Sequence, residues 1–413
     1  MLQGCFHQYL NCLIDIRKKM EQTGMEWTTV LIETEGELDE ICKTLLTLSF
    51  ITVDTEFMLG NKDEKIDKLC SEITPGNKDE KKDKLCLVQI GNPVEEVVYL
   101  IDCIKLDCVT KKLRELCEKP SIVKVFHDAR KDVKMLCPEG NFDIINLFDT
   151  QIAHLYLHNE KRISYKGLVN ELCNVTLDKS ETLSDWKVRP LTPKQIEYAA
   201  YDVTHLVMCY ERLKIQLQEK NRYDWVIEDC KRLGLRTTVD PSIAWIKIRK
   251  EFEGCYAKDA NKLTYFQLIC EHRSSEAKKQ HKRPTAILAN NTLKKLLSTS
   301  ISKWDPTRVP YLTHFFTWLQ KEKFPGNTQT EFAALVETNA TRVQLDTEEN
   351  FKLLSEKLEE ICEQNTISST VLLNHNQKIL LFYNLEGLLD QIETTYRGEM
   401  LTGFLTNFLH SLI

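Results

Sequence analysis

Three stretches of the sequence place carboxylate and phenol side chains at spacings that suit metal-dependent hydrolysis. The first contains Asp54 and Glu56, which follow an apolar, β-branched run at 50–53. On a strand, residues two apart project from the same face, so both carboxylates could hold one hard divalent cation. Taken alone the pair is weak support, because a solvated strand end has the same pattern.

The other two stretches fall in predicted helices. Asp132 lies about one helical turn from Asp128, and both could point toward the sheet edge. The helix dipole explains an acid at the N-terminus, which accounts for Asp128 better than for Asp132. Tyr198 and Asp202 are four residues apart, so a phenol that orients a water could sit beside a metal-binding carboxylate. An exposed helix face explains such a pair when it stands alone.

The elements that must position these residues are predicted from hydrophobic periodicity. Strands are expected at 29–32, 50–53, 85–90, 97–101 and 122–126, and helices at 35–48, 109–116, 129–136 and 191–217. Thr192-Pro193 marks the start of the last helix as a Thr cap followed by proline. Beyond about residue 218 strand signals stop and only helices are expected. The pattern predicts an α/β domain followed by an all-α region.

Two segments stand apart from this pattern. Residues 60–70 read GNKDEKIDKLC and residues 76–86 read GNKDEKKDKLC, a tandem duplication that differs at one position. The equal numbers of lysines and carboxylates over residues 60–86 predict a solvent-exposed segment that lies outside the packed domain. Residues 1–28 form an N-terminal extension in which Gln8, Asn11 and Asp15 interrupt any apolar secretion signal.

Composition limits the class of protein. The chain has 413 residues, 42% hydrophobic and 28% charged, with a net charge of −6. That charge argues against a wholly basic nucleic-acid binder but not against local basic strips, because exposed charges are screened beyond about 8–10 Å. The chain contains no run of eighteen apolar residues, so no membrane span is expected. The fifteen cysteines contain no C-x-x-C pair, so we expect reduced thiols, no zinc and a cytoplasmic protein. We also expect a monomer.

The ordered combination of a strand D-x-E, a helical aspartate and a helical Y-x-x-x-D resembles the tyrosine subgroup of the DEDD exonuclease superfamily, and within it ribonuclease D. The likeness runs from residue 29 to about 217. It is carried by FITVDTEF at 50–57, KLCLVQI at 84–90, FDTQ at 148–151, VTLDKS at 175–180, LSDW at 183–186, RPLT at 189–192 and YAAYD at 198–202. The resemblance implies a ribonuclease H-like α/β exonuclease domain, a mixed sheet flanked by helices, at 29–217, with 60–86 as an insertion.

The helical half is similar to HRDC modules, which bind nucleic acids. Asp240-Pro241 and Ala244-Trp245, then Arg283-Pro284, resemble a first module at 240–322. Arg397-Gly398-Glu399 resembles the end of a second, diverged module at 330–413. A linker is expected at 218–239, and Pro325-Gly326-Asn327 suggests another between the modules.

The resemblance implies a mechanism and a cofactor. Asp54, Glu56, Asp132 and Asp202 would hold two Mg²⁺ or Mn²⁺ ions about 3.5–4 Å apart. Asp54 would bridge the ions, Glu56 and Asp202 would complete the site that binds the nucleophilic water, and Asp132 would serve the second ion. Tyr198 would aim the water. The implied activity is 3′-5′ exonucleolytic trimming of RNA, with tRNA precursors as substrates and nucleoside 5′-monophosphates as products.

Substrate affinity is expected from a basic strip in the helical half. Residues 271–308 carry nine Lys or Arg against three acids, with Lys278, Lys279, Lys282 and Arg283 clustered around His281. Such a strip could follow a phosphate backbone with salt-sensitive affinity, although a solvated helix face explains any one lysine. The acidic stretch 346–363 predicts a smaller contribution from the second module.

Departures from the family leave two alternatives. The duplicated segment follows Asp54 and Glu56 directly, Asp128 adds a carboxylate near the expected metals, and Tyr201 stands where alanine is common. One alternative is a DNA-directed exonuclease of the same chemistry, because HRDC modules also accompany helicases. The chain has no G-x-x-x-x-G-K-[ST] loop of a helicase motor, which favours RNA as the substrate. The other is a catalytically impaired RNA-binding protein, which the presence of all five site residues disfavours.

Overall fold

The computed structural model divides the chain into two compact units, Met1–Arg236 and Thr237–Ile413. It describes residues 27–58, 83–137, 142–158, 162–177, 181, 184–234, 241–256, 259–280, 282, 284–325, 328–383, 385–392 and 395–412. The extension expected at 1–28 and the duplicated segment therefore lie outside the described residues, apart from 27–28 and 83–86.

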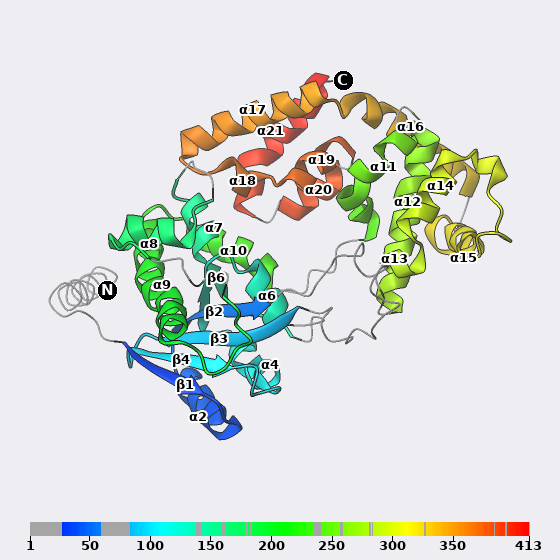
Figure 1. The fold of residues 1–413 in the computed structure, drawn as a ribbon. Helices are drawn as coiled ribbons and strands as arrows, with labels where there is room; N and C mark the ends of the chain where they lie inside the picture. The colour runs from blue at the N-terminus through cyan, green and yellow to red at the C-terminus, as the bar shows by residue number, and fades with distance from the viewer. Residues whose placement is uncertain are drawn as a thin grey trace. The chain divides into compact units, whose positions relative to one another are not determined.

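Unit 1 is built on a six-stranded mixed sheet with the order β1-β4-β3-β2-β5-β6 (Figure 1). β3 runs antiparallel to β2 and β4, while the other neighbours are parallel. The strands are β1 (Thr28–Ile32), β2 (Phe50–Met58), β3 (Lys84–Asn92), β4 (Val97–Asp102), β5 (Val123–Phe126) and β6 (Leu147–Asp149). The five predicted strands are confirmed, and β6 is an addition.

The helices of unit 1 flank this sheet. They are α2 (Glu35–Leu45), α4 (Val109–Lys112), α5 (Arg114–Glu118), α6 (Arg130–Leu136), α7 (Thr150–Leu155), α8 (Tyr165–Cys173), α9 (Pro193–Glu219) and α10 (Tyr223–Gly234). The helix expected at 109–116 is two short helices, because the chain turns at Leu113. The predicted mixed sheet with flanking helices is confirmed.

The long helix α9 forms the core of unit 1 with the central strands. It begins where the sequence predicted, with Thr192 as N-cap in a capping box with Gln195 and proline at the first position. Its small residues Ala199 and Ala200 and the branched Val203 are buried against strand residues such as Leu87. This packing holds α9 close to the sheet, and the predicted site residue Tyr198 packs at the edge of the same cluster.

The linker expected at 218–239 is largely helical. α10 occupies Tyr223–Gly234, and Val226 and Cys230 are fully buried in unit 1. The Cys230 thiol accepts a hydrogen bond from the Asp149 backbone N–H at the end of β6, at 3.2 Å. Unit 1 therefore includes α10, which packs against the end of β6.

Unit 2 is all helical, as predicted. Its elements are η3 (Pro241–Ile248), α11 (Arg249–Tyr256), α12 (Ala260–Lys279), α13 (Pro284–Ile287), α14 (Asn290–Ser298), η4 (Ile301–Lys303), α15 (Tyr311–Trp318), η5 (Leu319–Lys323), α16 (Thr328–Leu345), α17 (Glu348–Asn365), α18 (Ser369–Leu372), α19 (His375–Tyr383), α20 (Leu385–Ile392) and α21 (Tyr396–Leu412). None of the described helices of either unit combines the length and apolar character needed to span a bilayer.

The two expected helical modules pack together within unit 2. Arg249 forms an ion pair with Asp346 at 2.7 Å, and both side chains are largely buried. The Trp245 ring meets the Tyr383 ring edge-to-face at 5.0 Å between centroids. These contacts join the segments 240–322 and 330–413 into one compact body.

Candidate active site

β2 presents the first two site carboxylates from the middle of the sheet. It is paired on both sides, antiparallel with β3 and parallel with β5, so its backbone is fixed in register. Val53 and Thr55 are buried, whereas Asp54 and Glu56 are half-buried. The strand continues to Met58, with a register irregularity between Glu56 and Phe57. The pleat therefore directs both carboxylates to one face, as the spacing predicted.

α9 brings the other end of the sequence to the same face. The Thr52 hydroxyl on β2 donates a hydrogen bond to the Val203 carbonyl oxygen on α9 at 2.8 Å. This contact lies next to Asp202 in the chain. One carboxylate oxygen each of Asp54, Glu56 and Asp202 then lies within 4.8 Å of the others. Two segments about 150 residues apart in sequence thus converge on one acidic cluster.

Asp132 is held beside this cluster by a neighbouring strand residue. It lies in α6 and is buried, at 6% exposure. The Thr55 hydroxyl donates to Asp132 Oδ1 over 2.6 Å. The α6 helix is itself tied down by Asp149, whose carboxylate accepts the backbone N–H groups of Asp128 and Ala129 at 3.1 and 2.9 Å. Asp149 also caps the N-terminus of α7.

The carboxylates perturb one another strongly. Burial, and then repulsion from Asp202, raise the pKa of Asp54 well above its usual value. Burial, and then the neighbouring Asp54, Asp202 and Asp132, raise the pKa of Glu56 to about 10. Burial likewise raises the pKa of Asp132, and Asp54 adds to it, while the Thr55 hydrogen bond opposes the shift. Such mutual elevation is expected where like charges are gathered in a partly desolvated space.

The pKa of Asp202 depends on its burial, on the neighbouring carboxylates and on Tyr198. Burial raises its pKa to about 7, a hydrogen bond with Tyr198 lowers it, and Asp132 raises it. Tyr198 lies one helical turn before Asp202 and is half-buried, with its ring 6.0 Å from that of the fully buried Trp186. The phenol is therefore positioned by packing and directed at the acidic cluster.

The donor set fits hard divalent cations. Mg²⁺ and Mn²⁺ prefer oxygen ligands, and Mg²⁺ is commonly bound through only one or two carboxylates with retained waters. Asp54, Glu56 and Asp202 offer three carboxylates within reach of one ion. A cation there would relieve the repulsion that raises their pKa values. The cluster is thus suited to a divalent metal.

One expectation about the site requires correction. Asp128 does not share a helix with Asp132, since α6 begins at Arg130. Asp128 has a left-handed backbone, with φ of 57°, and its side chain is exposed. Its N–H group is used to bond Asp149. Asp128 therefore precedes the helix, because the chain bends sharply between β5 and α6.

Sequence reasoning missed the residues that support the cluster. Thr55 lies between the two strand carboxylates and was read only as part of the motif. Asp149 was noted within a similar stretch, but its capping role needs β6, which is too short to predict. Gln89 pairs with Asp54 across β2 and β3 and is fully buried, and its amide has no hydrogen-bond partner among the described residues. The pattern of β3 gave no sign of this buried amide.

The basic strip is only partly described. Lys278 and Lys279 are exposed at the C-terminal end of α12, and Lys282 is exposed just beyond it. Arg283 and His281 lie outside the described residues. Lys279 pairs with Glu276 at 2.9 Å and approaches Glu322 at 3.9 Å, so its charge is partly compensated.

Known proteins resemble this chain both in sequence and in fold. Residues 29–218 match the family described as 3′-5′ exonuclease. The chain is 29% identical over 272 residues to ribonuclease D of Granulibacter bethesdensis and 33% identical over 222 residues to that of Acidiphilium cryptum. These alignments cover 65% and 53% of this chain, and 62% and 52% of those proteins.

A solved structure extends the likeness of fold to both units. The crystal structure of Escherichia coli ribonuclease D, an exoribonuclease involved in structured RNA processing, superposes with a TM-score of 0.60 at 21% identity. The superposition covers 93% of this chain and 99% of that one. The helical half is therefore part of a shared architecture.

Proposed function

Since residues 29–218 match the family model described as 3′-5′ exonuclease, we propose that this chain is a ribonuclease D-like 3′-5′ exoribonuclease that hydrolyses phosphodiester bonds from the 3′ end of RNA. The observation that carries the proposal is the convergence of Asp54, Glu56 and Asp202 within 4.8 Å, with Asp132 hydrogen-bonded to the intervening Thr55. The fold likeness to a ribonuclease D supports it.

The four carboxylates have distinct tasks in this proposal. Asp54, Glu56 and Asp202 would hold one divalent ion, and Asp132 would serve a second. When bound, two Mg²⁺ or Mn²⁺ ions lower the pKa of an attacking water and stabilise charge on the phosphate and the leaving 3′ oxygen. The protein supplies fixed ligands: β2 is paired on both sides, and α9 is anchored through Thr52.

Tyr198 orients the nucleophile. Its hydroxyl hydrogen-bonds with Asp202, and its ring is held against Trp186. A water that approaches Asp202 can therefore accept or donate a hydrogen bond at the phenol oxygen without rearrangement of the ring. Positioning of this kind lowers the barrier by fixing the line of attack.

The proposed substrate is a single-stranded RNA 3′ end, with tRNA precursors as the physiological class and nucleoside 5′-monophosphates as products. The curated relatives are ribonucleases D, which supports RNA over DNA. The proposal includes HRDC-like modules in unit 2 that grip the phosphate backbone through Lys278, Lys279, Lys282 and Arg283. It also includes a monomer in the cytoplasm, which size-exclusion chromatography and cell fractionation would test.

The decisive experiment is product analysis of a 5′-end-labelled tRNA precursor incubated with Mg²⁺ or Mn²⁺, with and without EDTA. The proposal expects a ladder that shortens from the 3′ end, release of nucleoside 5′-monophosphates, and loss of both with EDTA. Asp54→Ala should abolish hydrolysis and leave RNA binding largely intact. Asp107→Ala is the matched control, because Asp107 is an exposed aspartate in the same unit.

The alternatives give different results in the same assay. Faster degradation of a matched DNA oligonucleotide would favour a DNA-directed enzyme. RNA binding without turnover in Mn²⁺ would favour a catalytically impaired binding protein. Retained metal-dependent cleavage by Asp54→Ala would exclude the carboxylate cluster as the reaction centre.

A further inference from the structure

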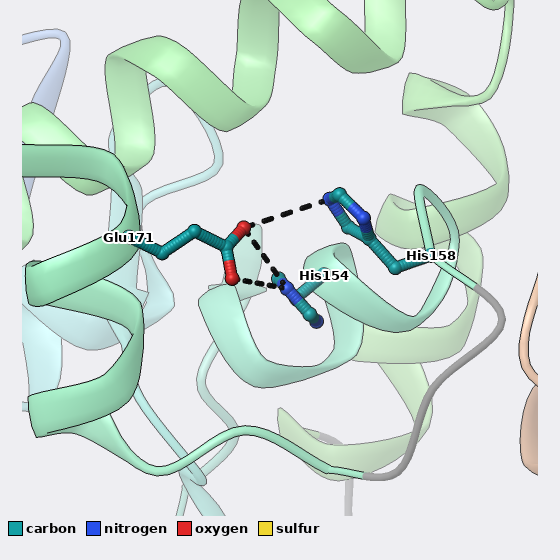
Figure 2. A group of neighbouring side chains, drawn as sticks. All are labelled: His154, His158 and Glu171. Atoms are coloured by element: carbon teal, nitrogen blue, oxygen red, sulfur yellow. Dashed lines mark hydrogen bonds and ion pairs between the residues drawn. The ribbon is translucent and has the colours of Figure 1, made fainter.

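A second cluster of metal-binding side chains lies in unit 1 and has no part in the proposed hydrolysis. His154 lies in α7, His158 lies four residues after His154 and just beyond that helix, and Glu171 lies in α8. One ligand atom from each lies within 4.8 Å of the others. Figure 2 shows the Glu171 carboxylate directed between the two imidazole rings.

The distances match those around a small tetrahedral ion. His154 Nε2 lies 3.3 Å from both Glu171 oxygens, and His158 Nε2 lies 3.7 Å from Glu171 Oε1. Zinc–nitrogen and zinc–oxygen bonds of about 2.0–2.1 Å in a tetrahedron separate neighbouring ligand atoms by about 3.3–3.4 Å. Both histidine–glutamate separations are thus close to those around one ion, and the ligand atoms of the two imidazoles lie within 4.8 Å of each other.

The two imidazoles are already arranged as a pair. Their rings stack with centroids 4.3 Å apart and an angle of 18° between their planes. Two stacked imidazoles beside one carboxylate bring their Nε2 atoms to the same side, as the dashed contacts in Figure 2 indicate. The spacing follows from the chain, because residues four apart across a helix end lie one above the other.

The three side chains of this cluster differ in burial. The His154 side chain is fully buried, and its Nδ1 has no partner among the described residues, so its polar contact is made through Nε2 alone. His158 and Glu171 are 37% and 39% exposed, which leaves the open side of the cluster accessible to an ion from solvent. The buried imidazole thus fixes one ligand, and two accessible side chains can close on the ion.

We propose that His154, His158 and Glu171 form a second metal site, for a borderline divalent ion such as Zn²⁺, which links α7 to α8. Two histidines and one glutamate are an established ligand set for zinc with a fourth position left to water. Imidazole ligands favour Zn²⁺ over Mg²⁺, so the site and the all-carboxylate cluster select different metals. The earlier expectation of no zinc rested on cysteine spacing, which this site does not use.

The inference is independent of the proposed nuclease activity and is tested by binding. The full-length protein is titrated calorimetrically with Zn²⁺ in excess Mg²⁺, which occupies the carboxylate cluster. The wild-type chain should bind one equivalent of Zn²⁺ more than His158→Ala. Loss of a ligand should weaken the affinity for that Zn²⁺ ion by at least about 100-fold, because removal of a residue that only hydrogen-bonds to a ligand commonly weakens metal affinity 10- to 100-fold. Glu171→Gln should give the same loss.

The control is His314→Ala, because His314 is an exposed histidine in unit 2 and outside the cluster. It should bind Zn²⁺ as the wild type does. Zn²⁺ should raise the melting temperature of the wild type and of His314→Ala but not that of His158→Ala. Circular dichroism verifies that each variant is folded. Equal Zn²⁺ binding by the wild type and His158→Ala, or no binding by the wild type, would overturn the proposal and leave only an ion pair between the helices.

Discussion

The substitution Thr55→Val isolates the support given to Asp132. Thr55 is 4% exposed, and its hydroxyl donates to Asp132 Oδ1 over 2.6 Å. Valine keeps the shape and removes the donor. Burial and Asp54 raise the pKa of Asp132, and the Thr55 hydrogen bond opposes them. The variant should therefore raise that pKa further, so a metal ion must displace a more tightly held proton.

The size of the effect follows from the type of hydrogen bond. A bond to an ionised group contributes about 1.5–3 kcal/mol. At about 1.4 kcal/mol per factor of ten, this corresponds to metal binding weakened roughly 10- to 150-fold. The same range is found when partners of metal ligands are removed from other proteins. We therefore expect the Mn²⁺ concentration for half-maximal activity to rise at least tenfold.

The assay is initial-rate hydrolysis of a short labelled RNA over a Mn²⁺ series, at fixed pH and ionic strength. Saturating Mn²⁺ should restore most of the maximal rate, because Asp132 itself is retained. A fall in maximal rate with an unchanged Mn²⁺ midpoint would mean that the hydroxyl acts on the substrate instead.

Thr52→Val is the matched control. Thr52 lies on the same strand and is fully buried, but its hydroxyl donates to the neutral Val203 carbonyl at 2.8 Å. It should cost about 0.5–1.5 kcal/mol of stability and move the Mn²⁺ midpoint much less. Equal Mn²⁺ midpoints for Thr55→Val, Thr52→Val and the wild type would refute the role assigned to the Thr55–Asp132 bond.

Three further predictions concern other parts of the chain. Arg189→Met should lower the unfolding free energy by about 3–5 kcal/mol in chemical denaturation, because it leaves the fully buried Asp102 unpaired. Burial raises the pKa of Asp102, but hydrogen bonds from Arg189 and the backbone outweigh burial and leave this pKa below its usual value. The difference in stability between the wild type and Arg189→Met should therefore be present above about pH 4 and shrink as acid protonates Asp102. Tyr198→Phe should reduce kcat about 100-fold or more with little change in KM, measured on the same RNA. The double change Lys278→Glu and Lys282→Glu should weaken RNA binding and flatten its salt dependence in fluorescence anisotropy; an unchanged slope would count against the basic strip.

Sequence patterns predicted the elements whose signals are local. The β-branched run at 50–53 identified β2, and Thr192 with Pro193 located the start of α9 to the residue. Both signals depend on neighbours in the chain, so they can be read without the fold. Five of the six strands and the helical second half followed from the same kind of signal.

Elements defined by distant contacts were missed. β6 has only three residues, and its strand character comes from pairing with β5. α10 was assigned to a linker because its short amphipathic pattern gives no sign of what it covers, although Cys230 is fully buried and accepts the Asp149 N–H. The two helical modules merge through contacts such as Arg249–Asp346, which no local pattern encodes.

The acidic cluster illustrates the same division. Spacing predicted that Asp54 and Glu56 share a strand face, and that Tyr198 and Asp202 share a helix face. Physical reasoning on the sequence could not bring the two faces together, and only the resemblance to a family did so. The His-x-x-x-His spacing of His154 and His158 is visible in the sequence, but it does not identify Glu171. Glu171 joins the two histidines only through the packing of α7 and α8.

The hairpin formed by β2 and β3 bears on how this chain tolerates changes in length. β2 ends at Met58 and β3 begins at Lys84, and their antiparallel register is set by pairs within the sheet, such as Asp54 with Gln89. Doubling the length of a connection adds only about 0.6 kcal/mol of closure entropy. Because the pairing of the two strands is set within the sheet, we expect a change in the length of their connection to cost little stability.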